Sequence, residues 1–179
     1  SELSRHVPFA VIHPETLSLI TGGPAIRRAL VDWVAFYRCV EFYDLWKNYQ
    51  RVLQQRNACL RDSKQRYALG YWTEQLVSLL PPLWLKRQQS LTWLEQGLQR
   101  YHSLVQSLGK IELKLSTGFP AYLDAMNSED LIYFLKGKQQ QELTQGFSLY
   151  GAHRADLQIH LAGQLAERVA SRGELKLLS

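Results

Sequence analysis

The stretch from Phe42 to Leu60, FYDLWKNYQRVLQQRNACL, decides the fold of this chain. Its large apolar side chains recur in alternating steps of four and three residues, which places them along one face of an α-helix. The members of this stripe are Phe42, Trp46, Tyr49, Leu53 and Leu60, with Arg56 at the position that completes the pattern. A heptad-like stripe of this kind packs against the stripe of a partner helix. The stretch therefore predicts one long helix of a helical pair.

A second stripe begins after the polar residues 61–66. Its members are Val77, Leu80, Trp84, Leu91, Leu94, Leu98, Tyr101, Val105 and Leu108, and Arg87 interrupts it. The polar residues between the stripes predict a turn, so we expect two antiparallel helices that form an arm. Pro81 and Pro82 must kink or split the second helix, because a proline inside a helix costs about 3 kcal/mol and removes a backbone hydrogen bond. Arg56 and Arg87 are expected to bury their aliphatic stems and to pair their guanidinium groups.

The segments on either side of the arm have shorter patterns. A short apolar run predicts a buried strand at 7–12. Alternation of apolar and polar residues predicts half-buried strands at 111–115 and 157–161, the last turning at Gly163. Short or capped helices are expected at Pro14–Ile20, from Pro24 to about Phe36, and from a capping Ser128 to about Gln145. The predicted fold class is mainly α with short β-strands (α+β), with the antiparallel arm inserted between strands.

Composition and charge restrict the class of protein. Apolar residues make up 46% and charged residues 21% of the 179 residues, which excludes general disorder. The longest uncharged apolar run, Leu76 to Leu85, is shorter than the ~20 residues that span a bilayer, so no membrane partner is expected. The formal net charge of +5 favours a polyanionic partner, nucleic acid above all.

No catalytic or metal-binding group is predicted. Cys39 and Cys59 lie outside any C-x-x-C cluster, which indicates a reduced, cytoplasmic location without a zinc site or a disulfide framework. The five histidines are scattered and form no Ser-His-Asp or Cys-His arrangement. The phosphate-binding pattern G-x-x-x-x-G-K-[ST] is absent, so we expect no self-sufficient nucleotide site and no enzymatic activity in the chain alone.

Three stretches together resemble the RecF family, the ABC-type ATPases of bacterial recombinational repair. Residues 14–32, PETLSLITGGPAIRRALVD, match the family pattern P-[DE]-x3-apolar2-x-G-x-P-x2-R-R. Residues 151–157, GAHRADL, and 171–178, SRGELKLL, are similar to its Gly-Pro-His-[RK]-x-Asp motif and its ABC signature. Gln54–Ala58 is also similar to a Gln-Arg-Asn segment of the family. Leu30 and Ala152 depart mildly, standing where the family usually has Phe or Ser, and Pro.

The resemblance implies a partial ABC-type ATPase head that carries the arm. Relative to the family, we expect the chain to be a central fragment without the N-terminal phosphate loop and the C-terminal strand with the Walker B acid. The expected domains are 1–36 at the end of one head lobe, 37–108 as the helical arm, and 109–179 leading to the signature segment. Ser171, Arg172, Gly173 and Glu174 are then implied to meet ATP and magnesium in trans, in a homodimer of the full-length protein. Because the remainder of the head is missing, the C-terminus is expected to be irregular.

The resemblance also implies DNA binding in the pathway by which RecO and RecR help to load RecA at gapped DNA. The candidate DNA-binding residues are Arg27, Arg28, His153, Arg154, Arg61, Lys64 and Arg66. Adjacent arginines on a helix face different directions, so one of the first pair could be solvated while the other meets a carboxylate. Asp156 could equally hold Arg154 locally, and the cations at 61–66 could belong to a solvated turn.

Two other functions remain open from the sequence. The arm could be a self-contained helical module that binds a protein partner. Alternatively, the chain could bind nucleic acid without sequence specificity, which a salt-sensitive shift of duplex DNA would reveal.

Overall fold

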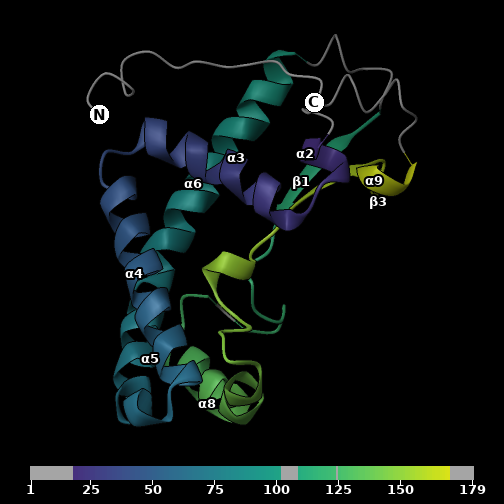
Figure 1. The fold of residues 1–179 in the computed structure, drawn as a ribbon. Coiled ribbons are helices and arrows are strands. Elements are labelled where there is room, and N and C mark those ends of the chain that lie inside the picture. Colours follow the sequence, from purple (N-terminus) through teal and green to yellow (C-terminus); the bar gives the residue numbers. More distant parts are fainter. Residues whose placement is uncertain (1–17, 102–108, 124, 170–179) are drawn as a thin grey trace. The chain divides into compact units, whose positions relative to one another are not determined.

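A computed structural model describes residues 18–101, 109–123 and 125–169, which fall into two compact units (Figure 1). Of the described residues, the first unit comprises 18–40, 87–101, 109–116 and 156–169, and the second comprises 41–86, 117–123 and 125–155. Most of the described elements are helices, and the strands form one small antiparallel sheet. This confirms the predicted mainly α class with short strands. The predicted strand at 7–12, most of the helix at Pro14–Ile20 and the C-terminal segment 171–178 lie outside the described residues.

The first unit packs helices against the sheet. Its elements are α2 (Ser18–Thr21), α3 (Pro24–Arg38), residues 87–100 of α6 (Leu80–Arg100), β1 (Ile111–Leu115), β2 (Leu157–Leu161), β3 (Gln164–Leu165) and α9 (Ala166–Val169). Pro24 is the first residue of α3, as predicted, where its missing N–H would have had no partner in the helix.

The sheet of the first unit has the strand order β1-β2-β3 with antiparallel neighbours. Leu113 lies opposite Ile159, so the apolar members of the two alternating patterns share one face. Ile159 and Leu161 pack with Ile20 of α2, and Leu157 packs with Val31 of α3. Both predicted strands are thus confirmed, and their periodicity determines which side faces the helices.

The turn between β2 and β3 lies at the predicted glycine. Ala162 has a φ of 47° and Gly163 a φ of 83°. Positive φ at both central residues is the feature of the two-residue hairpin turn that matches the twist of the flanking strands. Gly163 adopts this conformation without the steric cost that a side chain imposes.

The second unit is helical. Its elements are α4 (Phe42–Arg61), η2 (Ser63–Ala68), α5 (Leu69–Ser78), residues 80–86 of α6, α8 (Ser128–Gln145) and η4 (Ala152–Arg154). Cys59 and Leu60 of α4 pack with Leu69 of α5, and Leu143 of α8 packs against this cluster. Figure 1 shows α4 and α5 side by side, so the turn predicted at 61–66 joins two packed helices. The three consecutive domains predicted from the sequence do not coincide with the units, because 117–155 groups with 41–86.

The two prolines split the second helix of the predicted pair. Helix α5 ends at Ser78, and α6 begins at Leu80, so Pro81 and Pro82 occupy its first turn. The Leu79 N–H donates to the carbonyl of Leu76 at 3.2 Å, and the Leu83 N–H donates to the carbonyl of Leu79 at 3.3 Å. The first-turn N–H groups have no partner within a helix, so prolines here cost no helical hydrogen bond.

The cap of α8 differs from the prediction by one residue. The side chain of Asn127, not Ser128, accepts hydrogen bonds from the backbone N–H groups of Glu129 at 3.1 Å and Asp130 at 3.2 Å. Asparagine and serine are both strong caps, and the two are adjacent here, so the sequence alone did not distinguish between them. Gly146 ends the helix with a φ of 74°.

Across the described residues, no helix has both the length and the apolar character that crossing a membrane requires.

Candidate functional site

Arg27 of α3 forms a bidentate ion pair inside the first unit. Its Nε donates to Asp156 Oδ1 at 2.8 Å, and its Nη2 donates to Asp156 Oδ2 at 3.0 Å. Its Nη1 donates to the carbonyls of Gly22 at 2.6 Å and Ile20 at 3.3 Å. The hydrogen bonds with Asp156 raise the pKa of Arg27 above its usual value. The guanidinium therefore ties the glycine turn before α3 to the residue that precedes β2.

This pair answers two questions that the sequence left open. Arg27 is the arginine of the adjacent pair that meets a carboxylate, and Arg28 is half-buried beside it. Asp156 engages Arg27 and not Arg154, so the alternative in which Asp156 holds Arg154 is wrong. Arg27 and Asp156 also line a pocket of about 80 Å³ with Gln158 and Glu167.

Arg87 pairs in the same manner. Its Nε donates to Asp32 Oδ1 at 2.7 Å and its Nη2 donates to Asp32 Oδ2 at 2.9 Å, which joins α6 to α3 within the first unit. The side chain is buried, so the expectation that Arg87 buries its stem and pairs its head is confirmed.

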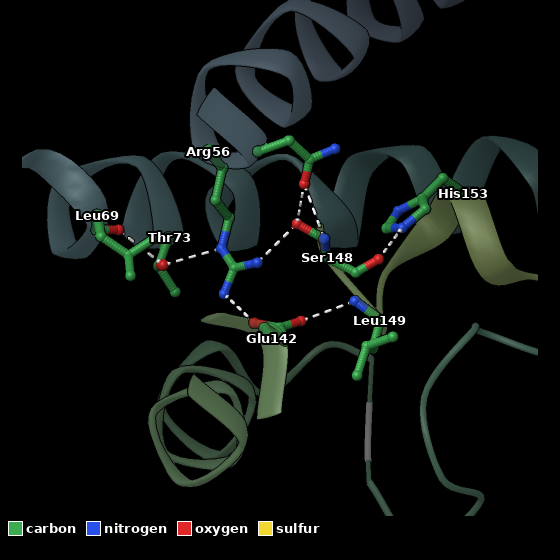
Figure 2. A network of polar contacts seen from close by, with 8 residues as sticks. Arg56, Leu69, Thr73, Glu142, Ser148, Leu149 and His153 are labelled. Atoms are coloured by element: carbon green, nitrogen blue, oxygen red, sulfur yellow. Dashed lines mark hydrogen bonds and ion pairs between the residues drawn. The ribbon is translucent and has the colours of Figure 1, made fainter. Parts of the chain in front are cut away.

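Arg56 is the centre of a buried polar network in the second unit (Figure 2). Only 1% of its surface is exposed. Its Nη2 donates to Glu142 Oε2 at 2.6 Å, its Nη1 to Ser148 Oγ at 2.6 Å, and its Nε to Thr73 Oγ1 at 3.0 Å. One guanidinium thus connects α4, α5, α8 and the segment after α8. The expectation that Arg56 buries its stem and pairs its head is confirmed.

The partners of Arg56 are themselves satisfied. Glu142 Oε1 accepts from the backbone N–H of Leu149 at 2.8 Å, and Asn57 Oδ1 accepts from the Ser148 N–H at 2.8 Å and from its Oγ at 2.7 Å. Thr73 Oγ1 donates to the Leu69 carbonyl at 2.8 Å. A buried charge is tolerated only when its hydrogen-bond partners are complete. Ser148 and Leu149 belong to these partners, so the network fixes the position of the segment 146–150.

His153 is held next to this network. Its Nε2 lies 3.0 Å from the Ser148 carbonyl, and its Nδ1 lies 2.9 Å from the Tyr49 hydroxyl. A carbonyl only accepts, so Nε2 donates to it, and in the neutral ring Nδ1 then accepts from the Tyr49 hydroxyl. The backbone N–H of His153 also donates to the Tyr49 hydroxyl at 3.3 Å. The histidine of the predicted motif therefore anchors its own loop.

Arg154, the next residue, is exposed on the surface of the second unit. Its guanidinium carbon lies 5.4 Å from the centre of the Phe147 ring, a cation–π arrangement. The guanidinium of Arg154 is therefore exposed to solvent, and the ring of Phe147 favours one orientation of it.

Two glycines allow two segments of the backbone to come into close contact at the start of the motif 151–157. Gly118 has a φ of 82° and Gly151 a φ of 138°, and the Gly151 N–H donates to the Gly118 carbonyl at 3.2 Å. A Cβ on Gly118 would collide with the Gly151 carbonyl oxygen and lie 2.8 Å from the Ala155 nitrogen. Only glycine fits at Gly118, which the sequence analysis did not identify.

Three exposed cations of the second unit lie close together in the sequence where α4 meets η2. We define the arm tip as the exposed side chains Arg61, Lys64, Arg66, Tyr67 and Tyr71. Asp62 lies within this segment, but its Oδ1 accepts from the Lys64 N–H at 2.9 Å and its Oδ2 from Gln65 Nε2 at 3.0 Å. The predicted turn is therefore capped by its own acid, and its three cations face solvent.

The remaining features of the described residues are a pocket and two thiols. An apolar pocket of about 340 Å³ in the first unit is lined by Leu30, Trp93, Leu94, Leu113 and their neighbours. Cys39 and Cys59 are buried and form no disulfide, and burial raises the pKa of the Cys59 thiol. Residues 18–101, 109–123 and 125–169 contain no group of three or more His, Cys, Asp or Glu that could hold a metal ion. Ser171, Arg172, Gly173 and Glu174 lie outside these ranges.

Two relatives of this chain carry the name DNA replication and repair protein RecF. The chain is 32% identical over 179 residues to the DNA replication and repair protein RecF of Aliivibrio fischeri (strain MJ11), and the match covers 99% of this chain and 48% of that protein. It is 33% identical over 178 residues to the protein of the same name from Photorhabdus laumondii, covering 99% and 47%. The chain thus spans about half the length of the curated relatives it matches. No family model matches it.

Two solved structures have a fold similar to that of this chain. The recombination mediator protein RecF-ATP in the RecFOR pathway superposes with a TM-score of 0.83 at 20% identity, over 96% of this chain and 48% of that one. The RecF-ATPrS structure gives a TM-score of 0.80 at 19% identity, over 93% and 46%.

Proposed function

Because this chain belongs to the RecF family along the stretch that it matches, we propose that it is a DNA-contacting part of a RecF-like DNA repair protein. The observation that carries this proposal is the division of the cations by the fold. Arg27, Arg56 and Arg87 point inward to Asp156, Glu142 and Asp32. Arg61, Lys64 and Arg66 are exposed together at the arm tip. The three inward cations stabilise the fold, and the outward group is available to phosphates.

The charges of the arm tip favour contact with a phosphate backbone over the alternative of a turn that is only solvated. Residues 61–71 contain three cations and one acid, and that acid caps the turn. Arginine and lysine side chains supply most contacts to DNA phosphates, and these contacts carry no base specificity. Arg154 adds a further exposed cation on the second unit, while Arg28 and His153 are less exposed members of the predicted set.

We propose in addition that Ser171, Arg172, Gly173 and Glu174 complete an ATP site in trans, in a longer RecF-like homodimer that also holds magnesium. A serine hydroxyl and an arginine cation suit a phosphate, and the chain has no G-x-x-x-x-G-K-[ST] pattern of its own. The chain alone is then expected to show no magnesium-dependent hydrolysis of ATP, measured as phosphate release. Hydrolysis by the purified chain above the buffer rate would contradict this division of the site.

The proposed setting of these contacts is the cytoplasm, at gapped DNA. There a RecF-like protein would act with RecO and RecR to load RecA. The names of the solved relatives place those proteins in the RecFOR pathway, which supports this proposal for the present chain.

Removal of the tip cations is expected to weaken DNA binding. The combined variant R61Q/K64Q/R66Q should bind a fluorescein-labelled duplex at least about tenfold more weakly than the unmodified chain at low salt, because three phosphate contacts are lost. Fluorescence anisotropy measures the affinity directly. All three side chains are exposed, so the folded state should be unaffected.

A matched control removes the same charge elsewhere. The variant K110Q/K114Q/K136Q also loses three exposed cations, none of which belongs to the arm tip. Its duplex affinity should stay close to that of the unmodified chain. Equal losses in both variants would show that net charge, and not the arm tip, determines binding.

One observation favours a second candidate function, the protein-interaction module. The apolar pocket of about 340 Å³ in the first unit offers Leu30, Trp93 and Leu94 to a partner. A chain that binds neither duplex nor single-stranded DNA even at low salt would favour this candidate over the first.

A further inference from the structure

The arm tip combines two kinds of side chain, and its cations account for only one of them. Tyr67 is 90% exposed and Tyr71 is 57% exposed, beside the three cations of the tip. A tyrosine ring ordinarily buries most of its area, because the ring is apolar apart from its hydroxyl group. Phosphate binding needs no exposed ring, so the two tyrosines point to a second type of contact at the same place.

The backbone that carries Tyr67 is held on both sides. Asp62 caps η2 through the Lys64 N–H, and the Gln65 N–H donates to the Asp62 carbonyl at 3.1 Å. At the other end, the Leu69 N–H donates to the Arg66 carbonyl, and Leu69 itself is buried against Cys59 and Leu60. The ring of Tyr67 is therefore displayed from an anchored turn, which lowers the entropy that a ligand must remove on binding.

Tyr71 lies four residues after Tyr67, and its ring is partly supported by a neighbouring side chain. Its ring meets the Trp72 ring edge-on, with centroids 5.1 Å apart. More than half of Tyr71 stays exposed, so one side is available to a ligand. Tyr67 lies in the last turn of η2 and Tyr71 in the first turn of α5, which follows η2 directly, so the two rings are displayed from successive turns of the chain.

The charge of the tip selects the ligand. Residues 61–71 carry a net charge of +2 from Arg61, Lys64, Arg66 and Asp62, so the partner is an anion with flat apolar groups. Single-stranded nucleic acid has both, and proteins bind it with cationic grooves and aromatic rings on which bases stack. In a duplex the bases are already stacked and do not reach a protruding ring. A protein partner would need acidic residues around an apolar anchor.

We propose that Tyr67 is a base-stacking residue, and that the arm tip binds unpaired nucleotides with Tyr71 as a second platform. The tip cations contact the phosphates on either side. This inference rests on the proposed function, since it assigns the DNA-binding tip to the single-stranded part of its substrate.

The test compares three variants of the full chain on two probes. Tyr67→Ala should weaken binding of fluorescein-labelled oligothymidylate by roughly tenfold, because one stacked base is worth about 1–3 kcal/mol. Tyr67→Phe keeps the ring and should bind as the unmodified chain does. Tyr133→Ala is the matched control, because Tyr133 is 82% exposed on α8 of the same unit but lies outside the tip. A duplex of the same length should bind all variants equally.

The outcomes separate this inference from the proposed function. Equal affinities of Tyr67→Ala and Tyr133→Ala for oligothymidylate would overturn base stacking, and the exposed ring would then suit a protein partner. Equal losses by Tyr67→Ala on both probes would overturn it as well. If neither probe binds the unmodified chain at low salt, the proposed function fails together with the inference.

Discussion

Replacement of Arg56 by methionine is expected to lower the free energy of unfolding by about 3–5 kcal/mol. The substitution leaves Glu142, which is fully buried, without its ion-pair partner. It also removes the donors to Thr73 and Ser148. Urea unfolding followed by circular dichroism at neutral pH measures the change. Arg51→Met is the control, because Arg51 lies on the exposed side of the same helix and should change stability by no more than about 0.5 kcal/mol.

The double variant R56M/E142L separates the charge from the packing. Apolar residues of similar volume can replace a buried ion pair at little cost, whereas removal of one partner is costly. The double variant should therefore recover only part of the stability that Arg56→Met loses, because the Leu149 N–H is left without its Glu142 acceptor. If the single variant lost less than about 1 kcal/mol of the free energy of unfolding, Arg56 would not be the centre of the buried polar network of the second unit.

Gly118→Ala is expected to cost about 3 kcal/mol or more. Alanine at Gly118 would need a positive φ and would collide with the Gly151 carbonyl oxygen. Gly137→Ala is the matched control. Gly137 lies within α8, nothing lies within 4 Å of the added Cβ, and alanine favours a helix by about 0.5–1 kcal/mol.

Denaturant unfolding of both glycine variants measures these opposite effects. Gly118→Ala should shift the midpoint to lower denaturant and Gly137→Ala to higher denaturant. If Gly118→Ala were as stable as the unmodified chain, the close approach of Gly118 and Gly151 would not exist in the folded protein.

The secondary structure could be predicted where the pattern is local. The stripe on Phe42–Leu60 and the alternation at Ile111–Leu115 and Leu157–Leu161 report the period of a single element. Pro81 and Pro82 marked a break because a proline acts on its own turn. The cap of α8 was misplaced by one residue, since Asn127 and Ser128 are adjacent and both cap well.

The partners of the buried arginines could not be predicted. An arginine on an apolar stripe must find an acid, so Arg56 and Arg87 were recognised as paired. The identity of the acid depends on how distant segments fold together. Glu142 is 86 residues from Arg56, and Asp156 is 129 residues from Arg27. Gly118 was missed for the same reason, because its neighbour Gly151 is close only in the folded chain.

The candidate site was likewise predictable only where it depends on local sequence. The sequence offered Arg27 and the cations of the turn 61–66 as candidates, but it did not show which of them form ion pairs inside the fold. The structure pairs Arg27 with Asp156 and leaves Arg61, Lys64 and Arg66 exposed. Exposure of a single side chain depends on the packing around it, which a sequence pattern does not contain.

The salt dependence of duplex binding tests the central claim that the tip cations bind DNA while the buried arginines hold the fold. Each neutralised phosphate contributes about −0.9 to the slope of log K against log salt. We predict that R61Q/K64Q/R66Q reduces the magnitude of this slope by up to about 2.7 and leaves the free energy of unfolding unchanged. An unchanged slope, or a slope that falls only because the variant unfolds, would contradict the account.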